Sequence, residues 1–216
     1  NGPGVTNLQQ DDHVVAVFVP SCGSCIPCSE GRPALCEPAA LANANGTLLG
    51  GQKRIRLRNE YITHHVGVSC FSEYAVVSQH SLVRIDKTVP LDLAALFGCA
   101  VITGVGAVVN TAKLNMGDTA VVVGLGGTGL AAVLGAKASG AKSVVGVDLN
   151  ENKLELGLKM GCDLVFHGSD EKIIEKIRAA TDGGADFAFE CVGSKKAMEM
   201  AYLLTRRGGT TCSSGL

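Results

Sequence analysis

The sequence contains no tryptophan and only three tyrosines and six phenylalanines among its 216 residues. It also carries little excess charge, because 19 lysines and arginines stand against 20 aspartates and glutamates. This balance excludes a basic surface for nucleic acids and a polybasic patch for membranes. Glycine is abundant, with 28 residues, and hydrophobic residues make up 46% of the chain. That composition is typical of a compact α/β enzyme core.

The sequence also lacks a convincing membrane-spanning run. Residues 93–112 and 119–136 are uncharged, but five glycines interrupt the second run, which a strand, a turn and a helix explain better. No secretion signal is visible, and nine cysteines would leave an unpaired thiol in a secreted protein. We therefore expect a cytoplasmic protein.

The first hundred residues have the pattern of irregular β structure. Strand candidates lie at residues 14–19, 71–77 and 82–85, where β-branched and aromatic residues cluster. Residues 37–60 are rich in loop-forming residues and include the basic run KRIRLR, which we expect to be a solvated surface.

From Asp118 onward, apolar strands alternate with helical segments. Strands are predicted at residues 119–123, 143–147, 164–166, 186–190 and 209–213, and helices at 128–139, 151–160, 170–180 and 195–204. Ser169 is the expected N-cap of the third of these helices. The alternation predicts an α/β domain in which helices cover both faces of a doubly wound parallel sheet of about five strands.

The segment Gly124-Leu-Gly-Gly-Thr-Gly129 matches G-x-G-x-x-G between a predicted strand and a predicted helix. In such a turn Gly124 permits a sharp bend, Gly126 lets the backbone approach a pyrophosphate, and Gly129 lets the helix pack on the strand. Gly127 lies in the same turn, where amide groups at the helix start favour a negative charge. A dinucleotide site is indicated; a glycine-rich turn without a ligand is the alternative.

Asp148 ends the second predicted strand, 19 residues beyond Gly129. A carboxylate at this place accepts hydrogen bonds from the adenosine ribose and repels a 2′-phosphate. Because no arginine follows in DLNENK, the expected cofactor is NAD rather than NADP.

Four cysteines have the spacing C-x2-C-x2-C-x7-C, at Cys22, Cys25, Cys28 and Cys36. Thiolates two residues apart can share a tetrahedral zinc ion, and four of them leave no open position for a substrate. We therefore expect a structural zinc site. An iron–sulfur cluster usually has a shorter final spacing, and a redox-active C-x-x-C pair is a further alternative.

Taken together, these features resemble the zinc-containing medium-chain alcohol dehydrogenases. The similar segments are the cysteine spacing, FSEYAVV, GCAVITGVGAVVNTAKL, GLGGTG, GVDLNENK and FAFECVG, and the resemblance covers essentially the whole chain. It implies a partial GroES-like catalytic domain with a structural zinc lobe at residues 1–100. It also implies a Rossmann NAD-binding domain, truncated at its C-terminus, at residues 101–216.

The resemblance further assigns roles to single residues. Cys99 matches a ligand of the catalytic zinc, and a cysteine there points to the alcohol and aldehyde branch of the family. Thr103 and Thr128 would lie against the nicotinamide ring. The remaining assignments are Lys153 beside the adenosine ribose, Val192 beside the adenine and Phe18 in the substrate pocket, where a plain core role is the alternative.

The chain departs from the family pattern at both ends. The first catalytic cysteine and a Gly-His-Glu motif would precede residue 1, and a sixth strand would follow residue 216. His64 and His65 are adjacent and outside the expected motif, so we interpret them as loop or pocket residues rather than ligands. His13, His80 and His167 are expected at the surface. We therefore expect a fragment whose activity belongs to a longer parent.

The implied reaction is reversible hydride transfer between a small-molecule alcohol and NAD, which gives an aldehyde or ketone. The family usually forms homodimers or homotetramers. One alternative is S-(hydroxymethyl)glutathione (formaldehyde) dehydrogenase, although the residues after Cys36 lack the basic side chain typical of that branch. A non-catalytic NAD-binding sensor or structural module is another alternative.

Overall fold

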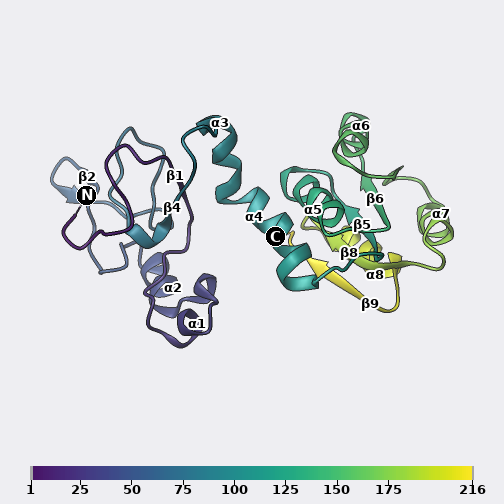
Figure 1. Ribbon diagram of the computed structural model, residues 1–216, viewed down its shortest axis with the longest axis horizontal. Helices are drawn as coiled ribbons and strands as arrows, with labels where there is room; N and C mark the ends of the chain where they lie inside the picture. The colour runs from purple at the N-terminus through teal and green to yellow at the C-terminus, as the bar shows by residue number, and fades with distance from the viewer. Residues whose placement is uncertain (1, 216) are drawn as a thin grey trace. The chain divides into compact units, whose positions relative to one another are not determined.

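The structure is a computed structural model that describes residues 2–215, and the chain divides into two compact units, Asn1–Cys99 and Ala100–Leu216 (Figure 1). The first unit has four short strands in two antiparallel pairs, β1 (Val14–Ala16) with β4 (Leu82–Arg84) and β2 (Arg56–Leu57) with β3 (Glu60–Tyr61). Its helices are α1 (Ile26–Ser29), α2 (Glu37–Ala44) and α3 (Leu91–Ala94), with 3₁₀ turns η1 (Pro33–Leu35), η2 (Gln79–Ser81) and η3 (Ala95–Gly98).

Two expectations for the first unit are wrong. The strand predicted at residues 71–77 does not form: no segment of residues 2–215 pairs with it, and the Phe71 and Tyr74 side chains are almost fully exposed. Helix α2 occupies the start of the region predicted to be loop. Pro38 falls in its first turn, where no amide donor is needed, and the run AALANA favours a helix.

The second unit confirms the predicted doubly wound parallel sheet. Its strands are β5 (Thr119–Val123), β6 (Ser143–Asp148), β7 (Leu164–His167), β8 (Ala185–Glu190) and β9 (Thr205–Ser213). Its helices are α4 (Ala100–Gly106), which continues into the π-helical turn η4 (Ala107–Ala112), α5 (Gly127–Ala138), α6 (Glu151–Met160), α7 (Ile173–Ala180) and α8 (Lys195–Leu204). All neighbouring strands run parallel, in the order β7-β6-β5-β8-β9.

The start of α7 differs from the prediction. Ser169 is not its N-cap, because the helix begins at Ile173. The Ser169 hydroxyl is instead within 2.8 Å of His167 Nδ1, and the Asp170 carboxylate accepts the Lys172 N–H at 2.9 Å. These local hydrogen bonds stabilise a turn that delays the helix.

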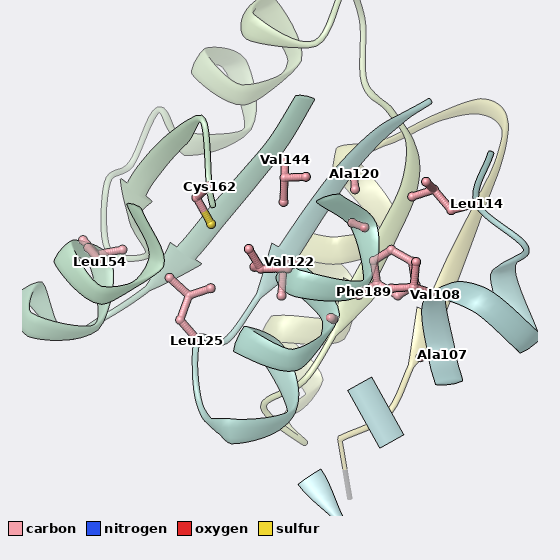
Figure 2. Close-up of a cluster of buried hydrophobic side chains, with 13 residues drawn as sticks. Ala107, Val108, Leu114, Ala120, Val122, Leu125, Val144, Leu154, Cys162 and Phe189 are labelled. Carbon is pink, nitrogen blue, oxygen red and sulfur yellow. The ribbon is translucent and has the colours of Figure 1, made fainter. Parts of the chain in front are cut away.

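The two faces of the sheet bury separate cores, because successive residues of a strand point to opposite sides. On one face Ala120 and Val122 of β5 pack with residues of η4, α5 and α6 (Figure 2). On the other face Val121 and Val123 pack with residues of α7 and α8. Because β5 is covered on both faces, its successive residues from Ala120 onward are all apolar, and this is why TAVVV is an unbroken apolar run.

The strand order creates a switch point between β5 and β8. The chain moves outward from β5 to β6 and β7, then crosses to β8 and β9 on the other side. At such a point the connections leave in opposite directions, and a crevice opens beyond the carboxyl ends of the two strands. The fold therefore predicts a ligand site next to the residues that follow Val123 and Glu190.

The two uncharged runs fold differently. Residues 119–136 form β5, the glycine turn and most of α5, as predicted. Within residues 2–215 no single helix is long and apolar enough to cross a membrane. Leu91–Gly98 and Ala100–Ala112 reach the required length and apolar composition only when they are counted together, and Cys99 interrupts that pair.

Candidate nucleotide site and metal centre

The turn after β5 has a conformation that favours glycine at its first position. Gly124 has a φ of +94°, and its N–H donates to the Val147 carbonyl at 2.7 Å. A Cβ on Gly129 would overlap the Gly124 carbonyl oxygen, so α5 begins pressed against the turn. Beside Gly126, by contrast, no described atom beyond its chain neighbours lies within 4 Å of an added Cβ. The backbone before α5 is therefore uncovered at Gly126, and the amide groups at a helix start favour phosphate groups.

Asp148 joins the end of β6 to this glycine turn. Its Oδ2 accepts the Leu125 N–H at 2.8 Å, and its Oδ1 accepts the Asn150 N–H at 3.0 Å. Lys153 Nζ lies 3.8 Å from Oδ2, and the Asp148 side chain is only 11% exposed. The structure thus brings Asp148 and Lys153 together beside the turn. Each carboxylate oxygen has lone pairs left to accept further hydrogen bonds.

Val192 approaches the same turn from β8. A Cβ on Gly124 would lie 2.5 Å from Val192 Cγ2, so the valine side chain packs against the bare backbone at Gly124. Val192 is nevertheless 54% exposed, which leaves an apolar surface at the carboxyl edge of the sheet. The glycine turn, Asp148 and Val192 therefore lie around the switch point, as the dinucleotide hypothesis expects.

Sequence reasoning missed Glu190, the last residue of β8, whose side chain is fully buried. Its Oε1 accepts the N–H groups of Val192 and Gly193, both at 2.7 Å, and its Oε2 accepts the Ser213 hydroxyl at 2.9 Å. Burial acts to raise the pKa of Glu190, but these hydrogen bonds outweigh it and hold the pKa below its ordinary value. The sequence feature that could have identified Glu190 is an acidic residue at the end of the mostly apolar strand ADFAFE.

The two threonines assigned to the nicotinamide lie where α4 packs on α5. A Cβ on Gly104 would overlap the Thr128 carbonyl oxygen and lie 2.7 Å from Ala131 Cβ, so the two helices are in close contact. Thr103 precedes Gly104, and both threonines are partly exposed. A Cβ on Gly127, the first residue of α5, would lie 3.2 Å from Ala100 Cβ at the start of α4. The helix contact thus brings Thr103 close to the start of α5.

The four predicted metal ligands of the first unit converge. The sulfur atoms of Cys22, Cys25, Cys28 and Cys36 all lie within 4.8 Å of one another. A tetrahedral zinc ion with bonds of about 2.3 Å holds its sulfurs about 3.8 Å apart, so only a small inward adjustment is needed. All nine cysteines are free thiols, and no disulfide competes for these four.

The hydrogen bonds around these sulfurs also suit a cation. Amide hydrogen bonds from Ser24 and Cys25 lower the pKa of the Cys22 thiol to about 6. Burial, together with hydrogen bonding to Cys25, raises the pKa of Cys28 to about 11. A bound zinc ion would stabilise all four sulfurs as thiolates.

The remaining assigned residues of the first unit are dispersed. Within residues 2–215 the four cysteines are the only cluster of three or more metal-ligating side chains, and exposed Cys99 is not part of it. His64 and His65 line a cavity of about 560 Å³; His64 is buried, and its Nε2 accepts the Arg54 N–H at 3.0 Å. Phe18 is 47% exposed. This placement supports the interpretation of the two histidines as pocket residues.

Comparison with known proteins identifies the family. Residues 1–87 match the alcohol dehydrogenase GroES-like domain, and residues 127–216 match the zinc-binding dehydrogenase domain. The chain is 38% identical over 223 residues to alcohol dehydrogenase class-3 from Drosophila melanogaster. It belongs to the zinc-containing alcohol dehydrogenases. The alignment covers 100% of this chain but 58% of that relative, so the chain is a partial member of the family.

Solved structures agree with this assignment. A zinc-binding alcohol dehydrogenase domain protein from Burkholderia ambifaria superposes with a TM-score of 0.93 at 30% identity, over 99% of this chain and 58% of the other. Benzyl alcohol dehydrogenase from Acinetobacter calcoaceticus gives 0.88 at 32% identity, with the same coverage. The expected GroES-like and Rossmann-like parts of this chain are therefore confirmed.

Proposed function

We propose that this chain is part of an NAD-dependent alcohol dehydrogenase that interconverts a small alcohol with its aldehyde or ketone. The observation that carries the proposal is the meeting of Asp148, Val192 and the glycine turn at the switch point of the sheet. In this proposal the glycine turn is the anion site, Asp148 is the ribose acceptor and Val192 is an apolar wall, and contacts with the turn bring the other two together. These three groups match the three chemical parts of an adenosine diphosphate.

The proposed cofactor pose follows from these contacts. The first amides of α5 bind the pyrophosphate beside Gly126, where an added Cβ would have no described neighbour within 4 Å beyond the adjoining residues. Asp148 accepts both ribose hydroxyls, and the Lys153 ammonium 3.8 Å away keeps the carboxylate in place. Val192 covers one side of the adenine. The Asp148 charge repels a 2′-phosphate and so favours NAD over NADP.

At the other end of the cofactor, Thr103 and Thr128 are proposed to face the nicotinamide from α4 and α5. Zinc, when bound, would supply Lewis-acid polarisation of the substrate oxygen, and Cys99 would be one of its ligands. Within residues 2–215 Cys99 belongs to no group of three or more metal-ligating side chains, and a catalytic zinc needs three protein ligands. We therefore propose that turnover requires residues beyond this chain. The four cysteines at 22–36 would hold a second, structural zinc.

Calorimetric titration with NAD and NADP tests the nucleotide part of the proposal. Asp148→Ala should weaken NAD binding by about 10–100-fold, because hydrogen bonds to a carboxylate contribute about 1.5–3 kcal/mol and each 1.4 kcal/mol is tenfold. It should also reduce the preference for NAD over NADP. Wild-type protein that is folded but binds no NAD would refute the proposed function.

Asp163→Ala is the matched control. The Asp163 carboxylate accepts the Val144 N–H at 2.7 Å and pairs with Lys137 at 3.1 Å, at the opposite end of β6. Its loss removes comparable hydrogen bonds from the same strand, far from the proposed ribose. NAD affinity should therefore stay within about twofold of wild type. An equal loss in both variants would mean that Asp148 acts only through stability.

A further inference from the structure

Glu190 is a charged group in an unusual place. It closes β8, a strand in the interior of the sheet, and it is 1% exposed. Among residues 2–215 it is the only buried acidic residue. A buried carboxylate is costly unless hydrogen bonds replace the water that it loses. Its presence at the ligand end of the strand points to a role in shaping that end.

The hydrogen bonds of Glu190 join two chain segments. Through Oε1 it holds the turn at Val192 and Gly193, and through Oε2 it holds Ser213 at the end of β9. Its main-chain carbonyl accepts the Ser214 N–H at 2.8 Å as well. Glu190 therefore joins the turn after β8 to the end of β9, through its carboxylate and through its main-chain carbonyl.

The hydrogen bonds of Glu190 also hold Val192, which lies beside the proposed cofactor site. Two consecutive amides bound by one oxygen leave the turn after β8 little freedom, and Gly193 adopts a φ of +82° within it. This geometry holds the Val192 side chain against Gly124, where a Cβ would lie 2.5 Å from Val192 Cγ2. Without the carboxylate, the two amides would seek water and the valine would lose its position.

We infer that Glu190 is a positioning residue for the dinucleotide, which holds the wall formed by Val192 at the correct place beside the glycine turn without touching the ligand itself. The inference rests on the proposed function, because it requires that a nucleotide bind at this edge of the sheet. According to this inference, binding of the adenine end depends on a hydrogen-bond acceptor at residue 190 and not on the negative charge of that residue.

The test compares two substitutions of Glu190 in the complete chain. Glu190→Met keeps approximate side-chain length but removes both acceptor oxygens, whereas Glu190→Gln keeps one oxygen for the amides of Val192 and Gly193. In calorimetric titrations Glu190→Met should bind NAD and AMP about tenfold more weakly than wild type. Glu190→Gln should stay within about threefold, since it retains the acceptor. Equal losses for NAD and AMP place the effect at the adenine end.

Asp186→Leu controls for stability. Asp186 is the second residue of the same strand, and its carboxylate accepts the N–H and hydroxyl of Thr119 and the Nε–H of Arg206. A comparable number of hydrogen bonds is lost, but at the edge of the sheet opposite the crevice. Its unfolding midpoint should fall as in Glu190→Met, while its NAD affinity should stay within about twofold of wild type. If Glu190→Met and Asp186→Leu lost NAD affinity to the same extent, Glu190 would act only through stability and the inference would be overturned.

The remaining outcomes are also decisive. If wild type binds NAD and folded Glu190→Met binds it equally well, the inference falls and the proposed function stands. If folded wild type binds no NAD, the proposed function falls and the inference with it. If Glu190→Met does not fold, Glu190→Asp replaces it: the charge remains, but one methylene fewer takes the acceptor out of reach of amides now at 2.7 Å. Unchanged NAD affinity in that variant would equally overturn the inference.

Discussion

Replacing Gly126 and Gly129 of the glycine-rich segment by alanine should have different effects on stability. Gly126→Ala adds a methyl group into space that no described neighbouring atom fills within 4 Å, at a φ of −77° that alanine readily adopts. Alanine is a poorer N-cap than glycine by roughly 0.5–1 kcal/mol, and the reduced freedom of the unfolded chain offsets this by a similar amount. The free energy of unfolding should therefore change by less than about 0.5 kcal/mol.

At Gly129 the same methyl group meets backbone. It would overlap the Gly124 carbonyl oxygen, and it would lie 2.9 Å from the carbonyl carbon and 3.3 Å from Val122 Cγ1, where ordinary contact begins at 3.4 Å. Carbonyl groups of a hydrogen-bonded turn cannot move aside as a flexible side chain does. Relief requires α5 to shift on β5, so Gly129→Ala should cost about 3 kcal/mol or more.

Nucleotide affinity separates the two effects. The methyl group of Gly126→Ala would occupy the volume proposed for the pyrophosphate, so NAD should bind at least about tenfold more weakly to a protein of normal stability. Urea unfolding followed by circular dichroism measures stability, and calorimetric titration with NAD measures affinity. The reasoning would be refuted if Gly126→Ala bound NAD like wild type, or if the two variants lost the same stability.

The metal site and two hydrogen-bonded carboxylates of β8 give two further predictions. Elemental analysis of the purified chain should find about one zinc ion per molecule. Cys36→Ser should lose this zinc, whereas Cys70→Ser, which lies outside the cluster, should keep it. Zinc retained by Cys36→Ser would exclude the four-cysteine site. Hydrogen bonds outweigh burial and hold the pKa values of Glu190 and Asp186 below their ordinary 4.5 and 3.8, so stability is present above these values and declines as pH falls. The urea midpoint of unfolding should thus drop as the pH falls from about 5 to 3. In Glu190→Gln the midpoint should depend less on pH. A wild-type midpoint that does not change with pH would contradict this reasoning.

The sequence predicted most of the second unit because its signals are local. Apolar runs such as TAVVV and SVVGV are separated by helical segments, and this rhythm alone indicates a parallel sheet. Helix α6 occupies the predicted residues 151–160. The strand predicted at residues 71–77 failed because strand propensity is realised only beside a partner strand, and residues 2–215 provide none.

By itself, the sequence determined the element types, the glycine turn, the cysteine spacing and the acid at the end of β6, since each depends on residues close together in the chain. Only the tertiary structure decided which groups meet across strands: Asp148 with the Leu125 amide, Val192 with Gly124, and Glu190 with the ends of both β8 and β9. Those contacts depend on the order of the strands in the sheet. Periodicity carries no information about that order, because it records only which face of an element is buried.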